Sequence, residues 1–96
     1  PTEIRLSNYP NPFNPTTSIH FSIEQNQQNE EIELEIFILK GQKVKTFHVI
    51  LSEVEGQTSV VWNGRDENNQ PVSSGIYFYK LKSGDFSSTK KMILMK

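Results

Sequence analysis

The densest group of side chains that could carry out chemistry lies in a polar segment at residues 63–70. Five of them offer hard oxygen donors, the ligands that calcium prefers: Asn63, Asp66, Glu67, Asn68 and Gln70. Their spacing does not match that of an EF-hand loop, and only two of the five carry a charge. Because the same residue types favour tight turns, we predict a turn-rich loop here and expect no metal ion or other cofactor.

The other residue types used in catalysis are scattered rather than grouped. His20 alternates with apolar residues and should face solvent, as should His48, so the two histidines do not form a metal cluster. The chain has no cysteine and no Gly-x-Ser-x-Gly motif, which excludes thiol catalysis and leaves no sign of an activated serine. Glu33 and Glu35 fall on the outer face of one predicted strand, where carboxylates are solvated and keep ordinary pKa values. We therefore expect that the protein is not an enzyme.

Length, composition and charge restrict the kind of protein. The 96 residues form one domain, residues 1–96, and the absence of alanine beside many β-branched residues argues against a helical bundle. A net charge of −1 gives no reason to expect a nucleic-acid partner. No apolar run approaches the roughly 20 residues of a membrane span, so association with an outer membrane should be through partners only. Since the sequence begins at Pro1 without a signal peptide, we expect a fragment of a longer protein.

The elements that must position these side chains are strands. Apolar and polar residues alternate with period two and predict seven short strands, at residues 4–9, 18–23, 31–38, 42–51, 58–62, 76–82 and 86–95. No segment has a credible helical pattern. Strands of this number and spacing are typical of an all-β, immunoglobulin-like or fibronectin-III-like antiparallel β-sandwich.

Three local features refine this pattern. Gly41 can adopt positive φ and so make the tight turn between the third and fourth strands. In the fourth strand Val44 is out of phase with the apolar residues that follow, and a bulge near residues 45–46 would place them all inside. Phe37 and Phe78 remain outside as an aromatic patch, which is the candidate binding surface of the sheet.

Prolines interrupt the chain after the first strand. Pro10, Pro12 and Pro15 remove donors from any ladder and fix φ, so residues 9–15 cannot continue the strand. We predict a rigid crossing from one sheet to the other, with Phe13 as its apolar anchor.

The segment at residues 73–77 resembles the tyrosine corner of immunoglobulin-like domains. Gly75 precedes Tyr77 by two residues and would let the phenol reach back to the backbone. Tyr79 stands where an antibody domain has its second cysteine, so packing must replace the disulfide. Trp62 lies near a strand end and should cap the core rather than bind a ligand.

Five segments, in this order and at this spacing, resemble a known family: residues 9–17, 36–44, 62–72, 74–81 and 90–96. The family is the C-terminal sorting domain of type IX secretion cargo, which is similar to the immunoglobulin-like domain of the flagellar hook-capping protein. The resemblance covers residues 4–96. Two turn residues depart from the family pattern, Asn63 in place of Asp and Asn69 in place of Gly. Asn69 must therefore adopt a left-handed conformation, or the turn must be of another type.

The resemblance implies partners and a location. The type IX translocon would recognise the domain, and a surface sortase-like peptidase would cut upstream of it. The cargo domain would pass through the periplasm of a Gram-negative bacterium and be secreted or joined to surface lipopolysaccharide. The resemblance favours the basic terminal strand as the recognised element: Lys90, Lys91, Met92, Ile93, Leu94, Met95 and Lys96. An edge strand can pair with a partner through its main chain, although its lysines would equally protect an exposed edge from aggregation.

Two other functions are compatible with the sequence. The chain could be an accessory binding or spacer module beside an enzyme, in contact with polysaccharide. It could also be a structural assembly domain in a surface or flagellar structure. Retention on insoluble polysaccharide would favour the first of these, and self-association would favour the second.

Overall fold

The computed structural model describes residues 3–24, 31–50, 58–84 and 86–96. The strands in this part of the chain are β1 (Glu3–Tyr9), β2 (Thr17–Glu24), β3 (Glu31–Ile38), β4 (Lys43–Ile50), β5 (Thr58–Trp62), β6 (Gly75–Ser83) and β7 (Phe86–Leu94). Each agrees with a predicted strand to within one residue at either end. Among the described residues there is no helix that could span a membrane.

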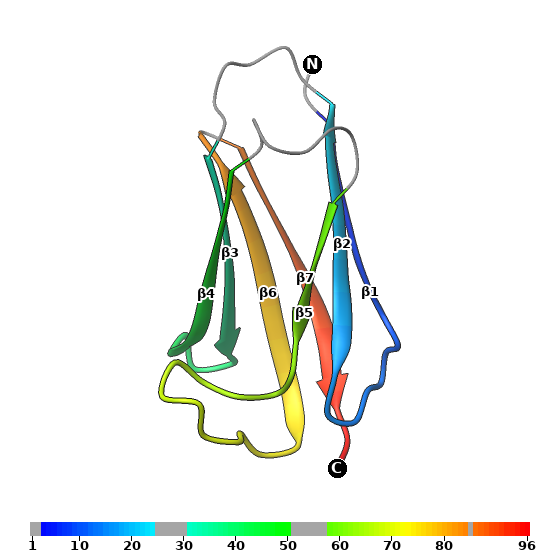
Figure 1. The fold of residues 1–96 in the computed structure, drawn as a ribbon, viewed down its shortest axis with the longest axis vertical. Helices are drawn as coiled ribbons and strands as arrows, with labels where there is room; N and C mark the ends of the chain where they lie inside the picture. Colours follow the sequence, from blue (N-terminus) through cyan, green and yellow to red (C-terminus); the bar gives the residue numbers. More distant parts are fainter. Residues whose placement is uncertain (1–2, 25–30, 51–57, 85) are drawn as a thin grey trace.

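The strands form two antiparallel sheets that pack face to face (Figure 1). One sheet has three strands in the order β1-β2-β5, and the other has four in the order β4-β3-β6-β7. β6 lies between β3 and β7, which explains why both of its faces are rich in apolar residues. The predicted immunoglobulin-like β-sandwich is confirmed.

The core fills the space between the sheets with side chains from alternating strand positions. Full burial of each large apolar side chain contributes about 1.5–3 kcal/mol to folding. In the described residues, no buried side-chain nitrogen or oxygen lacks a hydrogen-bond partner. The buried apolar residues are Leu6, Phe13, Ile19, Phe21, Ile32, Leu34, Ile36, Val44, Trp62, Tyr77, Tyr79, Leu81, Met92 and Leu94.

A bulge places Val44 in the core. Ile36 of β3 lies opposite Lys45 of β4. The next pair along the ladder is Phe37 with Lys43, so Val44 is the extra residue and its side chain turns inward. The bulge therefore buries Val44 as predicted, one residue before the predicted position, and Phe47 and Val49 are partly buried against the core, while Leu51 lies outside the described residues.

Hydrogen bonds of Tyr79, which stands at the position of the second cysteine of an antibody domain, join the two sheets. The hydroxyl of Tyr79 in β6 donates to Oδ1 of Asn8 in β1, at 3.0 Å. Nδ2 of Asn8 donates to Oγ1 of Thr17 at 3.1 Å, and that hydroxyl donates to the carbonyl of Pro10 at 2.8 Å. Burial raises the pKa of Tyr79 to about 12, so its hydroxyl stays protonated as a donor at physiological pH.

Glu35 corrects the expectation of solvated acids with ordinary pKa values. Its side chain is only 9% exposed, because Nζ of Lys43 lies 3.1 Å and Nζ of Lys82 lies 3.7 Å from its Oε2. Burial raises the pKa of Glu35, but the hydrogen bond and charge of Lys43, together with the charges of Lys82 and Lys80, outweigh it. The net effect lowers the pKa of this carboxyl group.

Replacing Glu35 with glutamine should remove an acid-sensitive part of the stability. Since the pKa of Glu35 in the folded protein lies below its ordinary value of 4.5, the ionised carboxylate stabilises the fold above that pH. This contribution is lost as the pH falls through the lowered pKa. The unfolding free energy of the wild type should therefore approach that of E35Q between about pH 5 and pH 3, measured by urea unfolding. K43Q should lose part of this pH dependence, because Lys82 and Lys80 remain, and parallel profiles for the wild type and E35Q would contradict this prediction.

Candidate functional site

The terminal strand β7 forms one edge of the four-stranded sheet and pairs with β6 without a register shift. Its side chains alternate between the two faces of the sheet. Met92 and Leu94 are fully buried in the core, so a partner cannot contact their side chains in the folded domain. Lys90, Lys91 and Lys96 are exposed. Of the residues predicted for recognition, the three lysines and Met95 are therefore accessible, Ile93 is half-buried, and Met92 and Leu94 are not accessible.

The carboxyl end of β7 is not a free edge, because the connection between β1 and β2 lies along it (Figure 1). The amide of Phe13 donates to the carbonyl of Ile93 at 3.0 Å, and the amide of Met95 donates to the carbonyl of Phe13 at 2.9 Å. The side chain of Asn11 adds a third bond, since its Oδ1 accepts from the amide of Ile93 at 3.0 Å. This part of the edge is therefore already paired within the domain.

This connection does not cross between the sheets as predicted. β1 and β2 are paired neighbours in one sheet, so the prediction of a crossing is wrong. The connection reaches the other sheet through the side chain of Asn11 and through Phe13, which is 2% exposed and pairs with the end of β7. Pro10, Pro12 and Pro15 are exposed, and each follows a cis peptide bond.

Among the described residues, no strand pairs with the amino-terminal part of β7 on the side away from β6, and this part is called the open edge below. In an antiparallel pair, successive residues direct their backbone N–H and C=O groups alternately toward and away from the neighbouring strand. Ile93 directs its groups away from β6, because they bond to the β1–β2 connection. Because the register is regular, Ser87, Thr89 and Lys91 direct theirs the same way. This row of groups is the part of the edge that another strand could join.

An aromatic cluster supports the end of the sandwich where β7 finishes. The ring of Trp62 lies 5.8 Å from that of Phe13 and 5.3 Å from that of Tyr77, measured between ring centroids. Nε1 of Trp62 donates to the carbonyl of Arg65 at 2.9 Å, and the hydroxyl of Tyr77 donates to the carbonyl of Ser73 at 2.6 Å. The bond from Tyr77 to the backbone four residues upstream is the one expected of a tyrosine corner. Trp62 is fully buried and so caps the core.

The connection between β5 and β6 passes close to the β1–β2 connection. Gly64 has φ of 76°, and a Cβ atom there would lie 2.9 Å from the carbonyl oxygen of Pro15. Only glycine fits this approach without a shift of the backbone. Asn69 has φ of 62°, so of the two predicted alternatives the left-handed conformation is the one that occurs. Gly41 and Gly75, with φ of 91° and 153°, lie at the β3–β4 turn and the start of β6.

Two acidic side chains of the β5–β6 connection accept hydrogen bonds from backbone amides. Oδ1 of Asp66 accepts from the amides of Asn68 and Gln70, both at 2.9 Å. Oε2 of Glu67 accepts from the amide of Thr46 at 2.8 Å and so binds the segment to the edge of β4. In the part of the chain that the structure describes, no three acidic or histidine side chains come together as a metal site would require. Asp66 and Glu67 therefore act as hydrogen-bond acceptors that stabilise the turn and attach it to the edge of β4.

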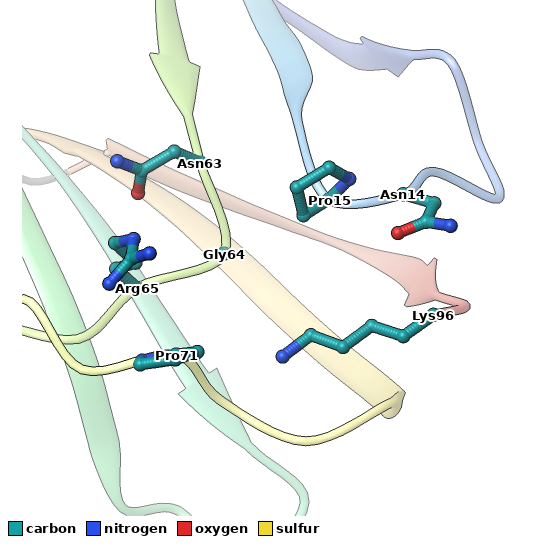
Figure 2. Close-up of a pocket in the computed structure, with 7 residues that line it drawn as sticks. All are labelled: Asn14, Pro15, Asn63, Gly64, Arg65, Pro71 and Lys96. Atoms are coloured by element: carbon teal, nitrogen blue, oxygen red, sulfur yellow. The ribbon is translucent and has the colours of Figure 1, made fainter.

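A pocket of about 290 Å³ lies between these connections and the end of the chain described here (Figure 2). Residues from three separate segments line it: Asn14, Pro15, Asn63, Gly64, Arg65, Pro71 and Lys96. The side chain of Lys96 extends toward the side of the pocket on which Arg65 and Pro71 lie (Figure 2). The amide of Lys96 donates to Oγ of Ser74 at 2.9 Å, which holds the backbone at this place.

The predicted aromatic patch lies on the outer face of the four-stranded sheet. Phe37 and Phe78 are half-buried and stacked, with their ring centroids 6.2 Å apart. Lys91 of β7 is the cross-strand neighbour of Phe78. Ile76, two residues before Phe78 on β6, has 47% of its surface exposed. The patch therefore adjoins the open edge of β7.

A model of the secretion system C-terminal sorting domain matches residues 7–95 of this chain. The chain belongs to this family. As a sorting domain, it carries the C-terminal secretion signal of the type IX system, serves secreted or cell-surface cargo and interacts with the type IX machinery. The resemblance that the five sequence segments indicated is confirmed.

Two solved structures share the fold of this sorting domain. Dimeric latent PorU from Porphyromonas gingivalis is 18% identical, with a TM-score of 0.75 over 98% of this chain and 9% of PorU. PorZ, an essential surface component of the type IX secretion system of the same bacterium, is 20% identical, with a TM-score of 0.67 over 95% of this chain and 11% of PorZ. The chain thus spans about a tenth of each of these proteins. No curated protein matches the chain.

The sorting domain brings together residues that sequence reasoning did not group. Asn11, Arg65 and Ser74 all lie at the end where β7 finishes, and each makes a hydrogen bond that holds a connection or the terminal residues. The only local signal was Asn11 itself, a hydrogen-bonding side chain placed between two prolines. Its partner lies 82 positions away in the sequence, so no local pattern identifies the pair.

Proposed function

We propose that this sorting domain acts without chemistry of its own, by presenting the edge of β7 to a strand of the type IX translocon. The open row of backbone groups at Ser87, Thr89 and Lys91 is the observation that supports this proposal. Main-chain bonds to such an edge supply affinity, and the neighbouring side chains supply specificity. Lys90 and Lys91 flank the open edge and would pair with acidic groups of the partner.

The proposal includes the route by which the cargo reaches the cell surface. In our proposal residues 1–96 form one unit, and a cargo domain precedes it. The unit directs the cargo from the periplasm to the surface of a Gram-negative bacterium. There a sortase-like peptidase cuts upstream of the unit, and the cargo is released or anchored to lipopolysaccharide. The peptidase supplies all of the covalent chemistry.

A secretion assay tests the strand-pairing proposal. A signal peptide, a fluorescent reporter and residues 1–96 are fused and expressed in a bacterium with a working type IX system. The variant T89P removes an N–H group that faces away from β6, which an edge strand tolerates, and its ring blocks the approach of another strand. We expect T89P to lower the reporter at the surface and in the medium by at least about tenfold, because roughly 1.4 kcal/mol of lost binding has that effect.

The matched control is T89V, which keeps the N–H group and a β-branched side chain. It should be secreted like the wild type. Circular dichroism and thermal melting of the purified variants show whether T89P is folded. Equal secretion of folded T89P and T89V would overturn the strand-pairing proposal. Deleting residues 90–96 is a weaker test, because it also removes the buried side chains of Met92 and Leu94.

A further inference from the structure

The pocket of Figure 2 has two cationic side chains, Arg65 and Lys96, and no acidic side chain in its lining. Within the described residues, neither cation takes part in a salt bridge. Nη1 of Arg65 donates to the carbonyl of Asn69 at 2.8 Å, which fixes one side of the guanidinium group and leaves further N–H donors available. The side chains of Arg65 and Lys96 are therefore two cations that no described acidic side chain pairs with.

The nearest acidic residue in sequence is turned away from this charge. Oδ1 of Asp66 accepts two backbone amides of its own turn. Asp66 also lines a different pocket, on the side of the connection that faces the β3–β4 hairpin. The two sides of the β5–β6 connection thus differ in charge, and the cations are on the side that faces the end of β7.

The walls of the pocket are held by the core. The carbonyl of Arg65 accepts the indole N–H of Trp62, and Gly64 packs against Pro15. The amide of Lys96 is bonded to Ser74. Because these contacts fix the backbone that carries the two cationic side chains, binding does not have to order that backbone.

We propose that this pocket binds the carboxylate of an Asp or Glu side chain on the secretion partner. A guanidinium group presents a planar fork that matches a carboxylate, and Lys96 adds a second charge. Pro15 and Pro71 offer apolar walls for the methylene groups of the acidic side chain. The inference rests on the proposed sorting function, since it assigns the chemistry of the same partner.

A titration tests the pocket without any secretion. The probe is glutamate blocked at both ends, N-acetyl-glutamate amide, added to the isotope-labelled domain at constant ionic strength and followed by NMR. We expect saturable shifts of the Arg65 and Lys96 signals with a dissociation constant on the order of 1–10 mM. R65Q should weaken binding at least about fivefold, because the fork is lost. The matched control K40Q removes an exposed lysine from the β3–β4 turn and should bind like the wild type.

The results of the titration either support or overturn the carboxylate-binding pocket. Saturable binding that R65Q and K96Q weaken and K40Q does not supports the pocket. Non-saturable shifts, or equal binding by R65Q and the wild type, overturn it. Inorganic phosphate binding more tightly than blocked glutamate also overturns the carboxylate assignment. Spectra of the free variants report whether they are folded. If the titration fails while T89P still blocks secretion, only the pocket is rejected and the strand-pairing proposal stands.

Discussion

Replacing Trp62 with alanine is expected to lower the unfolding free energy by about 4 kcal/mol. The indole is fully buried, packs against Phe13 and Tyr77, and donates its N–H to the carbonyl of Arg65. Alanine would leave a cavity at the end of the core and a carbonyl without its partner, and both effects destabilise the fold. Since domains of this size are stable by about 5–15 kcal/mol, the loss is a large part of the total.

Chemical denaturation of W62A and W62F separates the two contributions. Phenylalanine keeps an aromatic ring but removes the N–H donor, so W62F should lose less, about 1–2 kcal/mol. Tyrosine fluorescence or circular dichroism must be the probe, because the substitution removes the single tryptophan. A loss below about 1 kcal/mol for W62A would show that the side chain does not support the core in the way described.

Replacing Tyr77 with alanine should cost about 3 kcal/mol or more, through a cavity and the loss of the corner. Its ring is 4% exposed and its hydroxyl is bonded to the carbonyl of Ser73 at 2.6 Å. Burial raises the pKa of Tyr77, which keeps the hydroxyl protonated as a donor. Y77F isolates the hydrogen bond and should cost about 1 kcal/mol.

Thermal melting and urea unfolding measure both variants of Tyr77. A melting shift near zero for Y77A would rule out the tyrosine corner. Because Tyr77 and Trp62 are in contact, the losses of W62A and Y77A should not add. The double variant should lose less than the sum of the two single variants, since one enlarged cavity replaces two separate ones.

The strands could be predicted because each has one buried face, which leaves a period-two pattern in the sequence. The bulge could be predicted because Val44 breaks that pattern. The contact of Glu35 with Lys43 joins two strands of one hairpin, but the burial of Glu35 could not be predicted, because it also involves Lys82 of β6, a strand far away in the sequence that lies beside β3. The path of the β1–β2 connection was missed for a different reason. Prolines show that a strand ends, but not which strand the chain pairs with next.

The candidate site was predictable only in part. The terminal lysines could be identified from their position in a basic, strand-like segment. The pairing of Phe13 with the end of β7 could not, because it joins residues 81 positions apart and involves main-chain groups that every residue carries. The same holds for the pocket, whose cations come from two segments that meet only in the folded chain.

The pairing between the β1–β2 connection and β7 also determines how the domain would bear mechanical load. β1 and β7 run in the same direction along the long axis, so β1 begins at one end of the sandwich and β7 finishes at the other (Figure 1). A pull between a cargo ahead of β1 and a partner that holds β7 would act along both strands. The hydrogen bonds at Phe13 lie across that direction, and they would have to break together rather than one after another. Resistance to such a pull is governed by the rate of forced unfolding rather than by equilibrium stability. We therefore expect the domain to unfold slowly when it is pulled between the start of β1 and the end of β7.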